Sequence, residues 1–148
     1  MKIRLATKFD IPQIFDMLRN YRDAGTIGGV SDITSEETPL RLMSVIFAGG
    51  GFAFVSEQEG KLSGMLLAIK APHIWDNTKY EMHELAFWVE PASRGSTAGY
   101  RLINAYVDAC NDLKDQQQIT GYSISQMDGQ TLKYARFGFK RTQETWSA

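Results

Sequence analysis

Apolar and polar positions along this chain follow two periods, which predict short strands and amphipathic helices. Strands are predicted where apolar residues recur at every second position or form a short run, at residues 2–6, 52–57, 62–71, 80–89, 118–124 and 139–146. Helices are predicted where apolar residues recur every three to four positions, at about residues 11–24, 38–47, 98–113 and 128–137. Short polar, glycine- or proline-containing segments separate these elements, without a repeat or a linker. We therefore expect a single domain over residues 1–148.

The order of the predicted elements defines the fold class. Helices separate some of the strands, whereas the strands at 52–57, 62–71 and 80–89 follow one another directly, the first two through a turn at Gly60. This order predicts an α/β (mixed α+β) protein with a central twisted mixed sheet and helices on both faces. In the second helix, the spacing predicts a buried stripe made of Leu40, Met43 and Phe47.

Charge and composition exclude several classes of function. Sixteen Lys and Arg residues against seventeen Asp and Glu residues leave a net charge of −1, without the basic surface that binds nucleic acid or an anionic membrane. The longest apolar runs, such as residues 65–69, are far shorter than the roughly 20 residues of a membrane helix. Cys110 is alone, and no Cys/His group has metal-ligand spacing. We expect a cytoplasmic protein that binds neither nucleic acid nor membrane and holds no metal.

One segment carries candidate chemistry: an apolar strand at residues 85–89, then Pro91, then a loop of small residues that enters a helix. Small residues let a ligand approach the backbone closely, and the first N–H groups of a helix have no partner within it. Arg94 adds a cation with bidentate donors. The segment therefore predicts a phosphate or pyrophosphate cradle. It is not a P-loop, because G-x-x-x-x-G-K-[ST] is absent, and the glycines at 49–51 follow a helix rather than a strand.

Three motifs occur in register along the chain. Arg94 and Gly99 bound the sequence R-G-S-T-A-G, residues 132–139 read L-K-Y-A-R-F-G-F, and residues 3–11 read I-R-L-A-T-K-F-D-I. Together they resemble the GCN5-related N-acetyltransferases (GNAT). That family has a cofactor loop Q/R-x-x-G-x-G/A, a later signature lY-x-x-x-GF and an opening IR-x-A-T-x-x-D. Thr97 stands where the family usually has its first loop glycine.

This resemblance implies a GNAT-like acyl-CoA N-acyltransferase fold and a reaction. The reaction is transfer of an acetyl group from acetyl-CoA to a primary amine of a small molecule or peptide, by direct attack in a ternary complex. In the family this strand is bulged and splays from the next strand, here 118–124, and the bulge is expected at residues 87–89. The bulged strand and the loop imply the cofactor-binding residues Phe87, Trp88, Val89, Arg94, Gly95, Ser96, Thr97, Ala98 and Gly99.

The resemblance also implies two catalytic residues. Glu84 stands where several family members have a general base, and a carboxylate in a partly dry cleft is suited to that role; the alternative is a strand glutamate paired with a cation. Tyr134 matches the family's tyrosine that protonates the leaving thiolate; the alternative is a packed aromatic residue, with Ser125 as substitute donor. His83, next to Glu84, is expected on the opposite face as a hydrogen-bonded strand residue.

The family's fold builds its acceptor site from two loops, which fall here at residues 26–37 and 72–79. Asp32, Glu36 and Trp75 are the candidate substrate-binding residues, because acids beside an aromatic ring suit a cationic amine. The alternative is that these loops are acidic only for solubility.

A second function stays open at this point: a catalytically degenerate GNAT-fold protein that binds CoA or a protein partner without turnover. Thr97, and Met127 where the family often has an Asn, favour this alternative, whereas Glu84 and Tyr134 favour the enzyme. A homodimer formed through an exposed final strand with Trp146 is one option for assembly.

Overall fold

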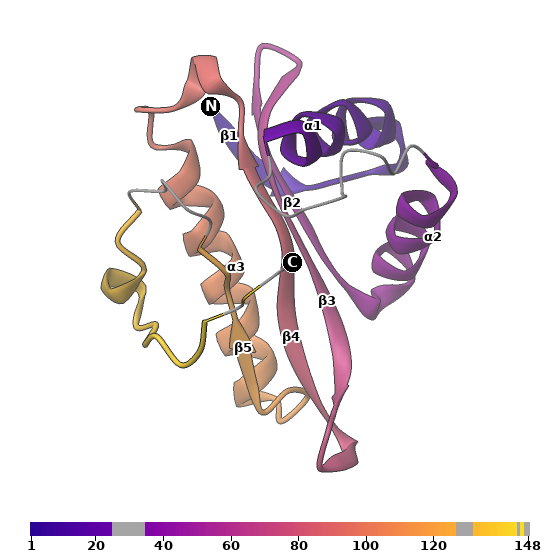
Figure 1. Ribbon diagram of the computed structural model, residues 1–148, viewed down its shortest axis with the longest axis vertical. Coiled ribbons are helices and arrows are strands. Elements are labelled where there is room, and N and C mark those ends of the chain that lie inside the picture. Colours follow the sequence, from indigo (N-terminus) through magenta and orange to yellow (C-terminus); the bar gives the residue numbers. More distant parts are fainter. Residues whose placement is uncertain (25–34, 127–131, 145, 147–148) are drawn as a thin grey trace.

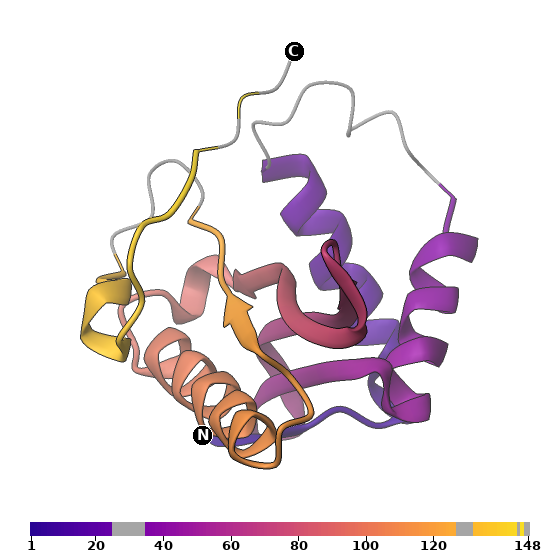
Figure 2. The same cartoon turned by 90° about the horizontal axis from the view of Figure 1, so that it is seen from below.

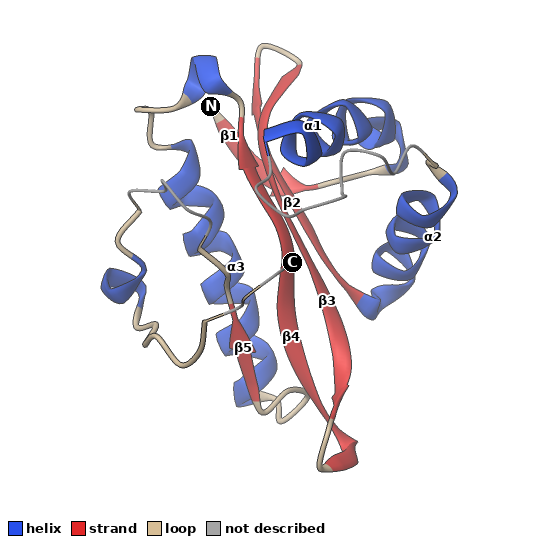
Figure 3. Ribbon diagram, viewed as in Figure 1, coloured by secondary structure: helices blue, strands red, loops and turns tan. Residues whose placement is uncertain are grey.

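The computed structural model describes residues 1–24, 35–126, 132–144 and 146. Its strands are β1 Lys2–Leu5, β2 Gly51–Gln58, β3 Lys61–His73, β4 Asp76–Val89 and β5 Gly121–Ser123. Its α-helices are α1 Ile11–Ala24, α2 Glu37–Val45 and α3 Ala98–Asp115 (Figure 3). Shorter helical turns are η1 Lys8–Asp10, η3 Ile46–Gly50, η4 Pro91–Ser93 and η5 Tyr134–Phe137.

The strands form one five-stranded sheet in the order β1-β2-β3-β4-β5. Neighbours are antiparallel from β1 to β4, while β5 pairs parallel with β4. α1 and α2 cover one face of the sheet and α3 covers the other (Figure 1 and Figure 2). The predicted mixed sheet with helices on both faces is confirmed.

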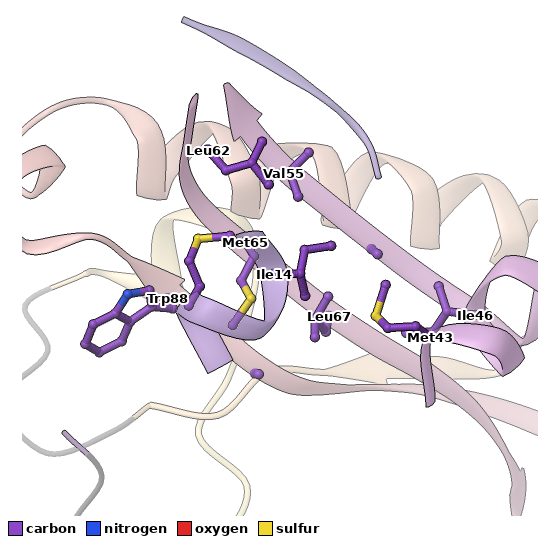
Figure 4. Close-up of a cluster of buried hydrophobic side chains, with 11 residues drawn as sticks. Ile14, Met43, Ile46, Val55, Leu62, Met65, Leu67 and Trp88 are labelled. Carbon is purple, nitrogen blue, oxygen red and sulfur yellow. The ribbon is translucent and has the colours of Figure 1, made fainter. Parts of the chain in front are cut away.

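The face under α1 and α2 is closed by a cluster of buried side chains. Its members come from both helices, from η3 and from the three central strands: Ile14, Met17, Met43, Ile46, Ala53, Val55, Leu62, Met65, Leu67, Ala86 and Trp88. Figure 4 shows Trp88 at one end of this cluster. Trp88 therefore belongs to the core and also lies next to the loop at residues 94–99, which the sequence analysis assigned to the cofactor.

The opposite face is closed by α3. Leu102, Ile103, Tyr106 and Cys110 of this helix are buried against side chains of β2, β3 and β4, as their helical spacing predicts. The Tyr106 hydroxyl also donates a hydrogen bond to the carbonyl oxygen of Ser123 at 2.9 Å. This bond ties the short strand β5 to α3 and fixes the start of the segment that follows it.

The N-terminal motif has a structural function. Arg4 of β1 donates to both carboxylate oxygens of Asp10, at 2.7 and 2.9 Å, and through Nε to Glu57 of β2 at 2.9 Å. Asp10 accepts in addition from the backbone N–H of Thr7 at 2.7 Å, so it caps the turn that leads into α1. The Arg and Asp of this motif therefore join the edge strand, the neighbouring strand and the first helix.

The C-terminal part of the chain differs from the prediction. Residues 139–144 form no strand, and the part of the predicted helix 128–137 that lies in the described residues is limited to the turn η5. Between Phe139 and Trp146 every residue is polar, so a strand there would have little apolar surface to bury. Phe139 anchors the start of the segment, with its ring 5.5 Å from that of Tyr122.

The second helix also differs in detail. Met43 is buried as predicted, whereas Leu40 and Phe47 are exposed. The helix contacts the core near its C-terminal end, through Met43 and, three residues later, Ile46 at the start of η3. The buried stripe therefore continues from Met43 to Ile46 and not to Phe47.

Candidate active site

Strand β4 carries a bulge. Ala68 of β3 pairs with Glu84 and Leu67 pairs with Ala86, so Leu85 is an extra residue between them. The bulge was expected at residues 87–89, and this expectation is wrong. Residues 86–89 pair regularly with β3, because Ala86 and Trp88 fill one core while Phe87 fills the other. The bulged residue is instead the exposed Leu85.

The two strands β4 and β5 pair over a short length only. Glu81, Met82 and His83 face residues 121–123, and the described residues show no pairing between the strands after His83 and Ser123. From Glu84 onward, β4 therefore presents its β5-side edge to the segment that follows β5. This opening between the strands is the place where the candidate catalytic residues meet.

Glu84 lies half-buried at the start of this opening. Its Oε2 accepts a hydrogen bond from the backbone N–H of Ser125 at 3.0 Å. Burial raises the pKa of Glu84 to about 7, and the hydrogen bond from Ser125 partly opposes this rise. A carboxyl group with such a pKa takes up and releases a proton near neutral pH.

Tyr134 reaches the same residue from the other side. Its hydroxyl donates a hydrogen bond to the carbonyl oxygen of Ser125 at 3.1 Å. Burial, followed by the charge of Glu84, raises the pKa of Tyr134 above its ordinary value. The phenol therefore stays protonated and can donate. One residue of backbone, Ser125, thus brings together the carboxylate and the phenol that the resemblance implied as base and acid.

Sequence analysis missed Tyr21 of α1 as a site residue. Burial and, after it, the charge of Glu84 raise the pKa of Tyr21, which places this phenol in the electrostatic environment of the carboxylate. Its ring meets Trp88 edge-on, with centroids 6.4 Å apart. In the sequence, Tyr21 occupies the last apolar position of the helical stripe. Its phenol at the end of this stripe was the one feature that could have indicated a site residue.

The small-residue loop is held to the end of β4 by Arg94. Its Nε donates to the carbonyl oxygen of Val89 at 2.9 Å, and its guanidinium lies 4.5 Å from the centroid of the Trp88 ring. Gly95 follows with φ of +91°, a conformation that other residues adopt at a cost. The geometry of this loop therefore depends on glycine at position 95 and on the clamp made by Arg94.

The loop enters α3 through two serine contacts. The hydroxyl of Ser96 donates to the carbonyl oxygen of Ser93 at 2.6 Å and accepts from the N–H of Ala98 at 3.2 Å. Thr97 is exposed and has φ of −82°, so its backbone does not require the glycine that the family usually has there. A Cβ built on Gly99 would lie 3.6 Å from Phe87, which shows how closely α3 approaches β4.

His83 has neighbours that explain its presence on the strand. Its Nδ1 is 3.0 Å from the hydroxyl of Ser123 and its Nε2 is 3.4 Å from a carboxylate oxygen of Glu81. It bridges β4 and β5 directly before the strands separate. The preferred interpretation of a hydrogen-bonded strand histidine agrees with these contacts.

The candidate acceptor residues are not gathered at Glu84. Asp32 lies outside the described residues. Glu36 is exposed and ion-paired with Arg19 of α1, so its charge is matched. Trp75 is 88% exposed at the tip of the β3–β4 hairpin, roughly 30 Å along β4 from Glu84 at the usual strand rise. Figure 1 shows this tip at the far end of the sheet from η4.

The described residues contain neither a metal-ligand cluster nor a membrane-spanning helix. Among the described residues, no group of three or more His, Cys, Asp or Glu side chains is arranged to hold a metal ion. No helix in the described part of the chain is both long and apolar enough to cross a bilayer.

Comparison with known proteins identifies the family. A model of the acetyltransferase (GNAT) family matches residues 15–139, and no curated protein matches the chain. Among solved structures, the chain is similar to a glucosamine-6-phosphate N-acetyltransferase from Arabidopsis thaliana, with a TM-score of 0.72 and 19% identity over 99% of this chain and 96% of that one.

Two other similar structures were determined with ligands. One is a predicted acetyltransferase with acetyl-CoA from Clostridium acetobutylicum, with a TM-score of 0.70 and 16% identity over 99% and 94% of the two chains. The other is an aminoglycoside acetyltransferase from an uncultured soil metagenomic sample in complex with sisomicin, with a TM-score of 0.67 and 17% identity over 99% and 92%. At these identities the matches show a common fold. With the family model covering most of its length, this chain belongs to the GNAT family of acetyl-CoA-dependent N-acetyltransferases.

Proposed function

We propose that this protein transfers the acetyl group of acetyl-CoA to a primary amine, by direct attack of the amine within a ternary complex. The observation that carries this proposal is the meeting of Glu84 and Tyr134 at the backbone of Ser125, in the opening between β4 and β5. The acceptor is a small molecule or a peptide with a free amine.

Glu84 acts as the general base. The amine nitrogen needs a free electron pair to attack the acetyl carbonyl carbon, so one of its protons must leave. A carboxylate with a pKa of about 7 accepts this proton directly or through water, and is substantially deprotonated at neutral pH. The backbone N–H of Ser125, which donates to Glu84, holds the carboxylate in place.

Tyr134 acts as the general acid. When the C–N bond forms and the C–S bond breaks, the electron pair of the C–S bond stays on sulfur, and the phenol of Tyr134 supplies the proton that sulfur gains. The hydrogen bond to the carbonyl of Ser125 orients this phenol before the reaction. The amine gives one proton to Glu84, and sulfur gains one proton from Tyr134. The reaction balances once Glu84 releases its proton to solvent and Tyr134 takes up another.

The residues at the start of α3 fit a CoA-type co-substrate, which supplies an acyl group activated as a thioester. The loop from Arg94 to Ala98 is exposed up to Thr97, consists mainly of small residues and leads directly into the positive end of an 18-residue helix. The open edge of β4 at residues 87–89 lies on the path from this loop to Glu84. Phe87, Trp88, Val89, Arg94, Gly95, Ser96, Thr97, Ala98 and Gly99 are accordingly the proposed cofactor-binding residues.

For the acceptor we retain the hypothesis that the loop after α1, with Asp32 and Glu36, selects cationic amines. Glu36 then exchanges its ion pair with Arg19 for one with the amine. Two similar structures are described as acting on or binding amino sugars, glucosamine 6-phosphate and sisomicin, and amines of this class are the first to test. Trp75 lies at the hairpin tip, far from Glu84. Within one chain it can therefore contact the acceptor only if the acceptor is long enough to reach from Glu84 to this tip. The variants Asp32→Asn and Glu36→Gln, which remove these two charges, test the hypothesis. An unchanged preference among amines would contradict it.

The experiment that tests the function measures consumption of acetyl-CoA with and without a panel of amines, namely spermidine, sisomicin, glucosamine 6-phosphate and a peptide with an N-terminal alanine. A thermal-shift comparison of acetyl-CoA, CoA and ATP accompanies it, since a ligand bound only by the folded protein raises the melting temperature. Turnover with an amine supports the proposal. Stabilisation by both CoA species without turnover of any amine would favour the alternative, a CoA-binding protein without catalysis.

A further inference from the structure

The indole nitrogen of Trp88 is a buried hydrogen-bond donor without an acceptor. Trp88 exposes only 8% of its surface, and within the described part of the chain its Nε1 has no hydrogen-bond partner. A buried N–H that stays unpaired has lost its water without gaining a bond in return. Because proteins pair nearly all such groups, an exception of this kind needs an explanation, and a missing bound molecule is one.

The position of Trp88 connects the two halves of the proposed site. The guanidinium of Arg94, from the small-residue loop, lies over its ring at 4.5 Å. The ring of Tyr21 meets it edge-on, with centroids 6.4 Å apart and planes 86° apart. Tyr21 in turn lies within the electrostatic influence of Glu84. The indole therefore borders both the loop that fits CoA and the group that contains the proposed base.

We propose that the Trp88 indole N–H binds an oxygen atom of a bound substrate, and that Tyr21 keeps the ring oriented for this contact. An indole N–H is a donor only, so its partner is a carbonyl or hydroxyl oxygen and not the ammonium group of the acceptor. This oxygen belongs either to acetyl-CoA, which carries amide and thioester carbonyls, or to the acceptor, as a sugar hydroxyl or a peptide carbonyl. The inference rests on the proposed function, because that function brings a substrate beside Glu84.

Arg94 gives the substrate a route to this nitrogen. The nitrogen is closed to solvent, so part of the cover over the ring must move when a substrate binds. Arg94 is an exposed side chain held by one hydrogen bond to Val89 and by its contact with the ring. It can leave the ring without opening the core on which Trp88 rests. Substrate binding therefore changes the surroundings of Trp88.

Tryptophan fluorescence tests this proposal without altering Trp88. The chain has three tryptophans, and Trp75 and Trp146 are both 88% exposed, so a Trp75→Phe/Trp146→Phe variant keeps Trp88 as the only emitter at little cost to the fold. Its emission is followed during titration with acetyl-CoA, with CoA, and then with spermidine, sisomicin and an alanine-starting peptide. A shift with acetyl-CoA alone assigns the oxygen to the co-substrate, and a shift that needs an amine assigns it to the acceptor. Unchanged emission with every ligand overturns the proposal.

A second measurement uses Trp88→Phe, with Trp146→Phe as the matched control, because Trp146 is 88% exposed. Removing one neutral hydrogen bond is expected to weaken binding of the substrate that supplies the oxygen by about three- to tenfold, with a smaller change for the other substrate and none in the control. Melting temperatures verify that the variant is folded. Equal affinities of the two variants for both substrates contradict the proposal.

The two proposals fail separately. If an amine is acetylated while Trp88→Phe and Trp146→Phe bind both substrates equally, the proposed function stands and the inference about Trp88 is wrong. If acetyl-CoA shifts the emission of Trp88 but no amine is acetylated, the indole contact stands and the proposed transfer to an amine is wrong.

Discussion

Glu84 acquires its chemistry from its surroundings. The side chain is half-buried at the bulge, its hydrogen-bond partner is a backbone N–H, and three phenols, those of Tyr21, Tyr106 and Tyr134, lie within the influence of its charge. Burial raises its pKa to about 7. A surface glutamate would be ionised at every physiological pH and would be a weak base.

We expect Glu84→Gln to lower kcat/KM for the amine by about 10²–10⁴-fold, the usual contribution of a general base. In the unsubstituted protein kcat/KM should rise with pH through about 7, because the base is the deprotonated carboxylate. The variant should lose this rise, whereas its affinity for acetyl-CoA should be unchanged. A pH–rate profile of both proteins measures this, and the same rise in the variant would assign the base to another group.

Tyr134→Phe removes one hydroxyl and keeps the ring that packs on Phe139. We expect kcat to fall by about 10²-fold or more while the affinity for CoA is retained, since this phenol is the proposed proton donor to the leaving thiolate. The loss of kcat should depend on the leaving group if Tyr134 is an acid and not only a packing residue. Acyl donors with a more acidic thiol should lose less activity in Tyr134→Phe. An equal loss with every donor would contradict the proposed role.

At the scale of elements, the loop before α3 depends on one backbone conformation. Gly95 has φ of +91° and open space around the position of a Cβ, so Gly95→Ala is strained by its backbone and not by a collision. We expect a loss of about 1–2 kcal/mol in the free energy of unfolding and weaker binding of acetyl-CoA. Gly121→Ala is the matched control, because a Cβ there also meets open space and its φ is not positive.

Urea unfolding and an acetyl-CoA titration of both alanine variants measure this expectation. If Gly95→Ala is as stable as Gly121→Ala and binds acetyl-CoA as tightly, the left-handed conformation is not what shapes the loop. Thr97→Gly extends the test. Because Thr97 already has φ of −82°, restoring the family's glycine should change binding only through the side chain.

Elements with a strong apolar period could be predicted from the sequence, and those without it could not. The spacing of Leu102, Ile103, Tyr106 and Cys110 gave α3 its correct inner face, because a single stripe on a long helix admits one orientation. Residues 139–146 alternate too, but their alternation is almost wholly between polar residues. A pattern that buries nothing does not determine a strand, and the described part of this segment is not one.

The candidate site could be predicted from the sequence only where its residues belong to short, continuous motifs. Glu84, Tyr134 and the loop 94–99 were found from motifs and spacing. The contact of both catalytic candidates with Ser125 required the separation of β4 from β5, which depends on a sheet register that no local pattern contains. Tyr21 and Trp88 lie far apart in sequence and meet only because α1 packs on the end of β4.

At the scale of the whole molecule, Asp10 links α1, β1 and β2 and thus holds the helix that carries Tyr21. It accepts two hydrogen bonds from Arg4, and this contact is the largest cause that lowers its pKa below the ordinary 3.8. A carboxyl whose pKa is lowered by folding stabilises the protein above its unfolded pKa, and this contribution is lost as the pH falls through the folded pKa. The link therefore stabilises the fold at neutral pH and weakens below about pH 4.

Asp10→Asn keeps the size of the side chain but removes its charge. We expect a loss of about 2–3 kcal/mol in the free energy of unfolding at pH 7, the usual range for a hydrogen-bonded charge that is buried. The difference from the unsubstituted protein should shrink as the pH falls below about 4, because protonation of Asp10 then removes the charge that Asn lacks at every pH. Asp108→Asn, at an exposed site on α3, should cost little at any pH. Urea unfolding across this pH range decides the matter: a pH-independent difference would mean that Asp10 acts through shape and capping, and that its charge does not hold α1 to the sheet.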